Sequence, residues 1–288
     1  MGIGEIFTVL LVQPITNLLV VIYQFLVYLH IPSPFGFSII LLTMIIRLAL
    51  FPLMSAQLKS SKKMQQLAPE LAEIKSKFKG DSKRQQAETM ALYKKYGINP
   101  AAGCVPVVVQ LPIIWGLYSV LQTAVKQTSV GAINHLIYSD SLKLKHLWDT
   151  HFFGVPLGKT PSELLPIIGV GILILPILTG ASQFVQSKMM LPAQTPKKVE
   201  KSKKSEGMGD FATAFQTQSL YIFPIMIGFF SFSFPSGLSF YWITFTVFGI
   251  IQQYLMQKGG VKTVPEVLAT LPPTKIVNKR KKKSQHGK

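Results

Sequence analysis

The chain has 288 residues, of which 48% are hydrophobic and only 15% are charged, and its mean hydropathy is +0.35. This composition departs from that of soluble domains and indicates an all-α polytopic membrane protein. A single cysteine excludes an intrachain disulfide. The net charge of +18 is concentrated in a few segments, so it indicates membrane orientation rather than nucleic-acid binding, and we expect no DNA partner.

The N-terminal segment, residues 1–34, is strongly apolar and contains no basic residue. It also lacks a small-residue cleavage site, so it does not resemble a secretory signal peptide. Pro14 interrupts the segment, and Asn17 and Gln24 give its second half a polar stripe. We therefore expect an interfacial helix at the outer membrane surface, and the alternative is an additional membrane span.

Arg47 lies in the expected first core transmembrane helix, residues 35–57, and is the only charged residue inside any membrane-length apolar segment. A central arginine costs roughly 2.5 to 3.5 kcal/mol on insertion, so such residues usually face a wet cavity or a partner. Apart from Glu5 at the start of the N-terminal segment, no other long apolar segment contains an acidic residue that could pair with it. Snorkelling is the alternative, but Arg47 is expected near the bilayer centre, where snorkelling is difficult. We expect a functional, hydrated arginine.

Residues 58–101 change abruptly to a charged sequence that predicts a helical hairpin. Apolar side chains recur at steps of three and four in the first arm. Gly80 and Asp81 form the expected turn, and a returning helix is expected from Ser82 to Tyr96. The apolar seam either joins the two arms, which is the commoner use of such side chains, or binds a client. Because two short arms are marginally stable alone, we expect this hairpin to be mobile.

Basic residues are distributed unevenly: ten lie between positions 58 and 101, six between 186 and 218 and nine after 256, against four between 125 and 162. By the positive-inside rule, the three basic regions are cytoplasmic, and five core spans then alternate correctly with a cytoplasmic C-terminus. The segments expected after the hairpin are a second core helix at 102–125, an extracytoplasmic loop at 126–162, a third core helix at 163–186, a cytoplasmic linker at 187–215, the fourth and fifth core helices at 216–256, and a basic cytoplasmic tail at 257–288.

The predicted fold is a five-helix transmembrane core with a cytoplasmic helical hairpin and an N-terminal interfacial helix. The spans carry no paired carboxylates, metal-ligand spacing, phosphate-binding loop or serine-nucleophile motif, so we expect neither an enzyme nor a cofactor or metal site. The lack of an acidic residue in the spans also disfavours a proton-coupled carrier. The spans do contain uncharged polar residues, which join helices or line a wet groove. Together with Arg47, these residues favour a hydrated cavity.

Five motifs stand out along the chain. They are Phe35-Gly-x-x-Ile-Ile-Leu-Leu-Thr-x-x-x-Arg47 followed by Pro52-Leu53, Gln57 and Ser60; Met64-x-x-Leu67-x-Pro69-Glu70; Tyr96-Gly-Ile-Asn-Pro100-x-x-Gly-Cys104-x-Pro106-x-x-x-Gln110-x-Pro112; Leu175-Pro-Ile-Leu-Thr-Gly180 with Gln186-Ser-Lys-Met; and Phe234-Pro-Ser-Gly-Leu238 with Tyr241-Trp242 and Gln252-Gln253. Together they resemble the YidC/Oxa family of membrane protein insertases, in the short bacterial form without a large periplasmic domain. The resemblance covers about residues 35 to 256.

The resemblance implies five membrane helices around a hydrophilic groove that is open to the cytoplasm and the lipid but closed toward the outside. The family's groove arginine matches Arg47, and the resemblance places Gln110, Gln183, Gln186 and Trp242 toward or beside the groove. It implies a membrane protein insertase and chaperone in the bacterial plasma membrane that needs no cofactor. The implied partners are nascent membrane proteins and membrane lipid, with the ribosome, through the basic tail, and a Sec-type translocon as further candidates.

Two other classes of function stay open at this point. In the first, the protein is a small-anion channel or carrier, and Arg47 is its selectivity charge. In the second, it is a non-catalytic tether whose cytoplasmic arms bind ribosomes or a translocon. Substitution of Arg47 distinguishes the two, because a tether does not depend on that residue.

Overall fold

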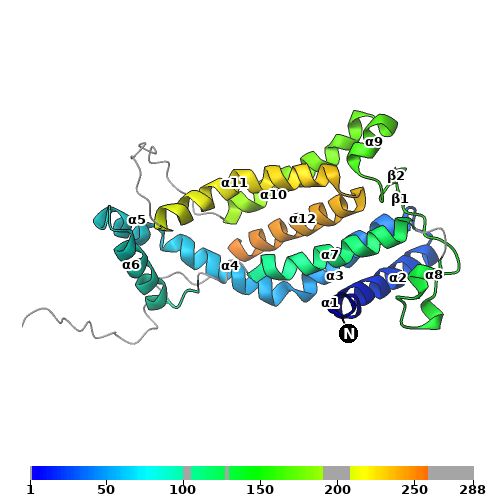
Figure 1. The fold of residues 1–288 in the computed structure, drawn as a ribbon, viewed down its shortest axis with the longest axis horizontal. Helices are drawn as coiled ribbons and strands as arrows, with labels where there is room; N and C mark the ends of the chain where they lie inside the picture. The colour runs from blue at the N-terminus through cyan, green and yellow to red at the C-terminus, as the bar shows by residue number, and fades with distance from the viewer. Residues whose placement is uncertain (1, 100–104, 127–129, 191–207, 259–288) are drawn as a thin grey trace, which may run out of the picture.

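The computed structural model of the chain describes residues 2–99, 105–126, 130–190 and 208–258 (Figure 1). The described part is mostly helical, and its only strands form one short hairpin, β1 (His151–Phe152) and β2 (Val155–Pro156). Cys104, most of the predicted linker 187–215 and nearly all of the predicted basic tail lie outside the described residues. The helical content agrees with the all-α class expected from composition.

The N-terminal segment forms one long helix, and Pro14 does not divide it. It consists of α1 (Ile3–Phe7), a π-helical turn η1 (Thr8–Val12) and α2 (Gln13–Tyr28). Proline is tolerated here because it lies in the first turn of α2, directly after the wider π turn. The resulting helix, Gly4–Tyr28, has 25 residues and a mean hydropathy of 2.1, which is long and apolar enough to cross a membrane.

The polar residues of α2 bind a loop of the same chain. The side-chain amide of Asn17 donates to the carbonyl of Leu136 (2.8 Å) and accepts from the backbone N–H of Tyr138 (2.9 Å). Gln24 donates to the carbonyl of Leu142 (2.9 Å). The polar stripe is therefore explained by contacts within the protein. Because Asn17 and Gln24 both bind the segment expected on the outer side, the interfacial position of the helix stays the prediction.

The expected first core helix, residues 35–57, is divided into two helices. α3 (Pro34–Ala49) and α4 (Phe51–Gln66) meet at Leu50 with a bend of 64°. Pro52 explains the bend, because it lacks the N–H that would continue the helical ladder and its ring crowds the preceding turn. α4 continues to Gln66, so part of the expected hairpin belongs to this helix.

The helical hairpin consists of α5 (Ala68–Lys77) and α6 (Ser82–Lys95), and its second arm begins at the predicted residue. The Asp81 carboxylate caps α6 by accepting from the backbone N–H of Arg84 (3.0 Å). The apolar seam joins residues of the hairpin, as the commoner alternative proposed. Its buried residues are Leu67, Tyr96 and Ile98, packed against Met64, Leu71, Leu92 and Tyr93.

The rest of the bundle consists of α7 (Val105–Lys126), α10 (Ile174–Met190), α11 (Met208–Ser233) and α12 (Ser236–Lys258). α12 packs against α3 and α7 on one side and α10 and α11 on the other (Figure 1). α10 and α11 approach closely at Gly180 and Gly228, where a Cβ on either glycine would lie 3.2 to 3.3 Å from a carbonyl oxygen of the other helix. Because α12 contacts both α3 and α7 and both α10 and α11, it joins the two sides of the bundle.

Few of the described helices meet the length and hydropathy of a membrane span. Gly4–Tyr28 and Val170–Met189 do, and the bent pair α3 and α4 makes a third if it is one span. The apolar stretches Val108–Ala124 and Leu220–Ser233 are shorter. The five-span core and the cytoplasmic position of the hairpin stay predictions.

One end of the bundle is covered by the segment between α7 and α10. It contains α8 (Gly131–Asn134), η3 (Asp140–Leu142), the β-hairpin, α9 (Pro161–Ile168) and η4 (Val170–Leu173). The expected third core helix, 163–186, is broken at Gly169, whose φ of +84° is incompatible with a continuous helix. The rings of Phe35 and Trp148 pack with a centroid distance of 5.0 Å and an interplanar angle of 51°, and both are buried. The cover is thus anchored by aromatic side chains at the first turn of α3.

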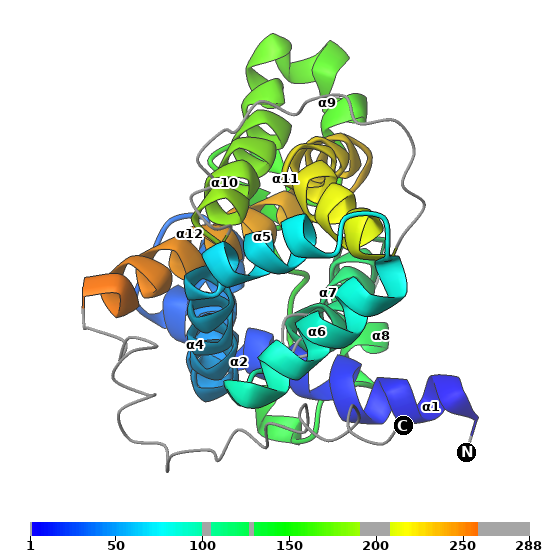
Figure 2. The same cartoon turned by 90° about the vertical axis from the view of Figure 1, so that its left-hand side faces the viewer.

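Figure 2 shows the molecule from the side of the hairpin, with α5 and α6 in front of the bundle. The covered end and the hairpin lie at opposite ends of the long axis (Figure 1). This arrangement agrees with the alternating topology predicted from the basic residues, in which the loop 126–162 and the hairpin lie on opposite sides of the membrane.

Candidate functional site

Arg47 is buried against α12. Only 1% of Arg47 is exposed. Its Nε and Nη2 atoms donate to the carbonyl oxygen of Phe245, at 3.0 and 2.7 Å. The guanidinium carbon also lies 3.6 Å from the centroid of the Phe245 ring, which is a cation–π contact. One residue of α12 therefore supplies both the acceptor and the aromatic face.

The sequence predicted a hydrated arginine and did not predict these two partners. The expectation assumed that an arginine without an acidic partner needs water. A backbone carbonyl and an aromatic ring contact the guanidinium here, because the planar group both donates and stacks. Neither partner can be identified from residue type, since every residue has a carbonyl and the chain has 19 phenylalanines.

Gln186 of α10 reaches the same point of α12 as Arg47. A Cβ built on Gly249 would overlap Nη2 of Arg47 and Nε2 of Gln186, so both side chains lie directly against this glycine. Both groups are hydrogen-bond donors, and an acceptor that enters between them would meet a concentrated set of N–H groups. The sequence pattern predicted Arg47 and Gln186 as site residues but gave no reason to select Gly249.

Gln110 of α7 lies on the other side of the same stretch. Its side-chain amide forms a hydrogen bond with the hydroxyl of Tyr241. The Tyr241 ring stacks on Phe245 with a centroid distance of 5.8 Å and an interplanar angle of 28°. Gln110 is therefore connected to the Arg47 contact through two aromatic rings of α12.

Trp242 and Gln183 form a direct pair between α12 and α10. The indole Nε1 of Trp242 donates to Oε1 of Gln183 at 3.2 Å. All five side chains singled out from the sequence thus contact α12 or belong to it, within residues 241–249. Because they come from α3, α7, α10 and α12, only the packed bundle brings them together.

Two buried hydroxyl and amide atoms near this cluster have no hydrogen-bond partner in the described structure: Oγ1 of Thr246 and Oε1 of Gln252. The amide nitrogen of Gln252 donates to Oγ of Ser55 (3.4 Å), and Gln253 donates to the carbonyl of Met189 (2.7 Å). Polar contacts therefore continue along α12 toward the hairpin end of the bundle.

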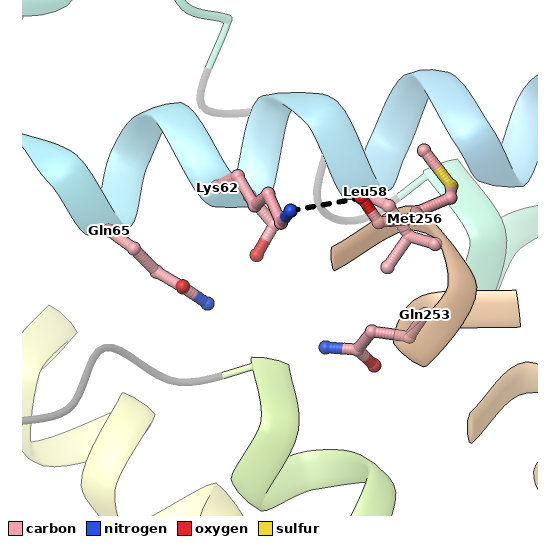
Figure 3. A pocket seen from close by; sticks show the side chains of 6 residues that line it. Leu58, Lys62, Gln65, Gln253 and Met256 are labelled. Atoms are coloured by element: carbon pink, nitrogen blue, oxygen red, sulfur yellow. Dashed lines mark hydrogen bonds between the residues drawn. The ribbon is translucent and has the colours of Figure 1, made fainter. Parts of the chain in front are cut away.

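At that end a small open pocket lies between α4 and α12 (Figure 3). Its walls are apolar at Leu58 and Met256 and polar at Lys62, Gln65 and Gln253. The amine of Lys62 donates to the carbonyl of Met256 (3.2 Å), as the dashed line in Figure 3 shows. The pocket therefore combines apolar walls with one cation at the end of α12 that is nearer the hairpin.

No cluster of three or more histidine, cysteine, aspartate or glutamate side chains that could hold a metal ion occurs among the described residues. The polar side chains that contact residues 241–249 of α12 are uncharged apart from Arg47. Such a set can bind an acceptor-rich chain by hydrogen bonds and charge.

Together, the bundle and this cluster define a helical membrane protein with a buried arginine held by the helix that joins its two sides. Comparison with known proteins specifies the class further. The model of the family described as 60Kd inner membrane protein matches residues 26–263. The chain belongs to this family, the YidC/Oxa membrane protein insertases.

Relatives of this chain include bacterial and chloroplast proteins. It is 35% identical over 237 residues to the membrane protein insertase MisCA of Bacillus subtilis, covering 81% of this chain and 74% of the relative. It is 33% identical over 226 residues to the membrane protein insertase YidC of Fusobacterium nucleatum, covering 78% of this chain and 87% of the relative. It is 33% identical over 259 residues to the chloroplast inner membrane protein ALBINO3 of Arabidopsis thaliana, covering 81% of this chain but only 49% of that protein.

Proposed function

We propose that this protein inserts integral membrane proteins into the bacterial plasma membrane and assists their folding, without a nucleotide or metal cofactor. The observation that carries the proposal is the position of Arg47, a buried cation surrounded by uncharged donors and acceptors on α12. The names of the relatives, which include two membrane protein insertases, support the same activity.

In this proposal, the client's hydrophilic segment enters from the side of the hairpin. The basic hairpin and tail receive the nascent chain, with the ribosome as the source, and a Sec-type translocon is a further partner. After the hairpin, an acidic segment would meet Lys62 at the pocket between α4 and α12. The amide side chains of Gln110, Gln183 and Gln186 would then line a groove beside α12.

Arg47 then exchanges the Phe245 carbonyl for a client carboxylate. A carboxylate accepts two parallel N–H bonds from a guanidinium and forms the stronger, charge-assisted pair. The low dielectric of the site strengthens this attraction relative to water. The exchange leaves no net charge in the site, which lowers the barrier for moving an acidic segment into the membrane.

The direction of insertion is set by the apolar helix of the client. Its transfer from water to lipid contributes about 25 cal/mol per Å² of buried apolar surface. The hydrophilic segment is released to the outer side when this helix partitions into lipid. The protein therefore lowers a barrier, and hydrophobic transfer supplies the free energy.

The test is reconstitution of wild-type and Arg47→Ala protein into liposomes, with protease protection of a single-span client. Two matched clients share one apolar helix and differ only in an acidic or an amide-substituted tail. We expect Arg47→Ala to lower insertion of the acidic client by about tenfold, the effect of losing a charge-assisted hydrogen bond, and to change the other client little.

Lys145→Ala, which removes an exposed basic residue from the segment that covers the opposite end of the bundle, is the control and should insert both clients like the wild type. Equal loss of both clients in Arg47→Ala would refute the proposed attraction. Anion flux through the purified protein would instead support a channel, and full activity of Arg47→Ala would support a tether.

A further inference from the structure

We infer that Gly249 is the positioning residue for Arg47: by lacking a side chain, it uncovers the Phe245 carbonyl and provides the space that the guanidinium shares with Gln186. Nothing in the sequence pattern or the family resemblance selects this glycine. The inference deepens the proposed function and rests on it for the insertion measurements, while its structural part is tested separately through stability.

The helical geometry of α12 explains why residue 249 controls access to residue 245. In an α-helix the Cβ atom points back toward the N-terminus, and a side chain covers the turn that precedes its own Cα. Gly249 lies one turn after Phe245, so its missing side chain would lie over that carbonyl. Both hydrogen bonds from Arg47 go to the same carbonyl oxygen.

The neighbours of Gly249 identify what the space is used for. The nearest atoms that a Cβ would meet are Nη2 and Cζ of Arg47 and Nε2 of Gln186, all of them side-chain atoms. Glycines that let two helices approach have a different surrounding: at Gly180 and Gly228 the nearest atoms are backbone atoms of the opposite helix. Gly249 therefore accommodates two polar side chains rather than a second backbone.

Arg47 has little freedom to give way to a larger residue. It is 1% exposed, and the Phe245 ring lies 3.6 Å from its guanidinium carbon. A methyl group at position 249 would lie closer to Nη2 than two such atoms can approach, so the guanidinium would have to shift from its present position on the Phe245 carbonyl. The positive charge would then no longer be held at a defined depth on α12, where an acidic client segment is to meet it.

The experiment compares Gly249→Ala, Arg47→Ala and the double variant in the liposome assay with the acidic and amide-tailed clients. We expect Gly249→Ala to lower insertion of the acidic client by about tenfold, as for the loss of a charge-assisted hydrogen bond, and to leave the amide-tailed client nearly unchanged. Adding Gly249→Ala to Arg47→Ala should cause no further loss, because Gln186 can then move into the space that the guanidinium leaves.

Two glycines provide matched controls. Gly228→Ala disturbs a helix contact away from Arg47 and should lower the melting temperature without distinguishing the two clients. Gly171→Ala faces open space and should behave like the wild type. Wild-type insertion of the acidic client by Gly249→Ala, or a full additional loss in the double variant, overturns the inference.

Stability measurements separate failure of this inference from failure of the proposed function. If the wild type inserts neither client, the proposed function fails. The inference is then decided by melting temperatures, because Gly249→Ala should destabilise the wild type but not the Arg47→Ala protein. If Gly249→Ala alone does not fold, recovery of a folded protein in the double variant supports the inference, and failure to recover overturns it.

Discussion

Two buried threonines, one in α12 and one in α10, differ in whether their hydroxyl groups have hydrogen-bond partners. Thr246 is fully buried and its hydroxyl has no partner in the described structure. Thr179 of α10 is also fully buried, but its hydroxyl donates to the carbonyl of Leu175 (2.8 Å) and accepts from Ser231 (3.2 Å). The two threonines therefore form a natural pair for measuring the value of a buried hydroxyl.

Thr246→Val should leave the free energy of unfolding unchanged or raise it slightly, because it removes an unpaired polar atom without changing the shape of the side chain. Thr179→Val should lower it by about 1 to 2 kcal/mol, because it removes one hydrogen bond and leaves Ser231 with a poorer set of partners. Chemical unfolding in detergent measures both. Comparable destabilisation by both substitutions would mean that the Thr246 hydroxyl has a partner, such as a bound water or client.

At the residue scale the sequence was sufficient to select Arg47 and the amide side chains, because a charged or amide residue within an apolar segment can be recognised from the sequence alone. It was insufficient for Phe245 and Gly249. Their roles come from a backbone carbonyl and from the lack of a side chain, and neither leaves a compositional signal. Only packing of α3 on α12 reveals them.

Among the elements, the hairpin formed by α5 and α6 has one notable polar contact at its base. The hydroxyl of Tyr96 donates to Oε1 of Glu70 (2.8 Å), and Tyr96 is only 7% exposed. Burial, and secondarily the hydrogen bond to Glu70, raise the pKa of the Tyr96 hydroxyl above its ordinary value. The contact therefore requires the protonated tyrosine.

A raised pKa in the folded state stabilises the hairpin below the unfolded tyrosine pKa of about 10, and this contribution is lost as the pH rises through the folded value. We expect the protection factor of amides near Ile98, which corrects the exchange rate for intrinsic base catalysis, to fall in that alkaline range. Tyr96→Phe should destabilise the hairpin by about 1 kcal/mol at neutral pH and weaken the alkaline effect.

Part of the alkaline effect should remain in Tyr96→Phe, because burial also raises the pKa of Tyr93. Tyr138→Phe, which removes an exposed hydroxyl outside the hairpin, is the control and should not change the profile. An unchanged alkaline response in Tyr96→Phe would exclude the Glu70 contact as its cause.

The boundaries of the elements could be predicted where local chemistry decides them. The capping carboxylate of Asp81 and the positive φ of Gly80 match the turn expected from these two residue types. Pro14 and Pro52 show where this reasoning fails. Both are prolines in apolar helices, yet one is accommodated by a π turn and the other accompanies a bend of 64°. Tertiary packing decides between these outcomes.

At the scale of the whole molecule, the orientation of the N-terminal helix determines on which side the N-terminus lies. If Gly4–Tyr28 crosses the membrane, the N-terminus is on the same side as the hairpin, whereas an interfacial helix leaves it outside. Asn17 and Gln24 bind the carbonyls of Leu136 and Leu142 in the loop predicted to lie outside, so the interfacial form stays the prediction although the helix is long enough to cross.

Single cysteines in a Cys104→Ser background test this topology with a membrane-impermeant maleimide on intact cells. We expect Ser139→Cys to react from outside, and Lys83→Cys to react only after permeabilisation. Gly2→Cys should behave like Ser139→Cys. Protection of Gly2→Cys until permeabilisation would establish the crossing helix and contradict the interfacial form.

The segment that covers the end of the bundle also completes the first turn of α12. The backbone N–H groups of Ser236 and Gly237 donate to the carbonyls of Lys159 (2.9 Å) and Leu157 (2.8 Å), and the Ser236 hydroxyl binds the same Lys159 carbonyl across 77 residues of sequence. These are among the N–H groups that a helix cannot satisfy by itself. The start of α12 consequently depends on an earlier part of the chain being in place.

This dependence has a consequence for the order in which the protein is made. Contacts across so many residues form late, because the intervening chain must first be closed into a loop. The segment around residues 157–159 must therefore reach its final position before the last described helix can dock. An insertase of this architecture would itself be a demanding client, whose own biogenesis ends with the helix on which its buried arginine is held.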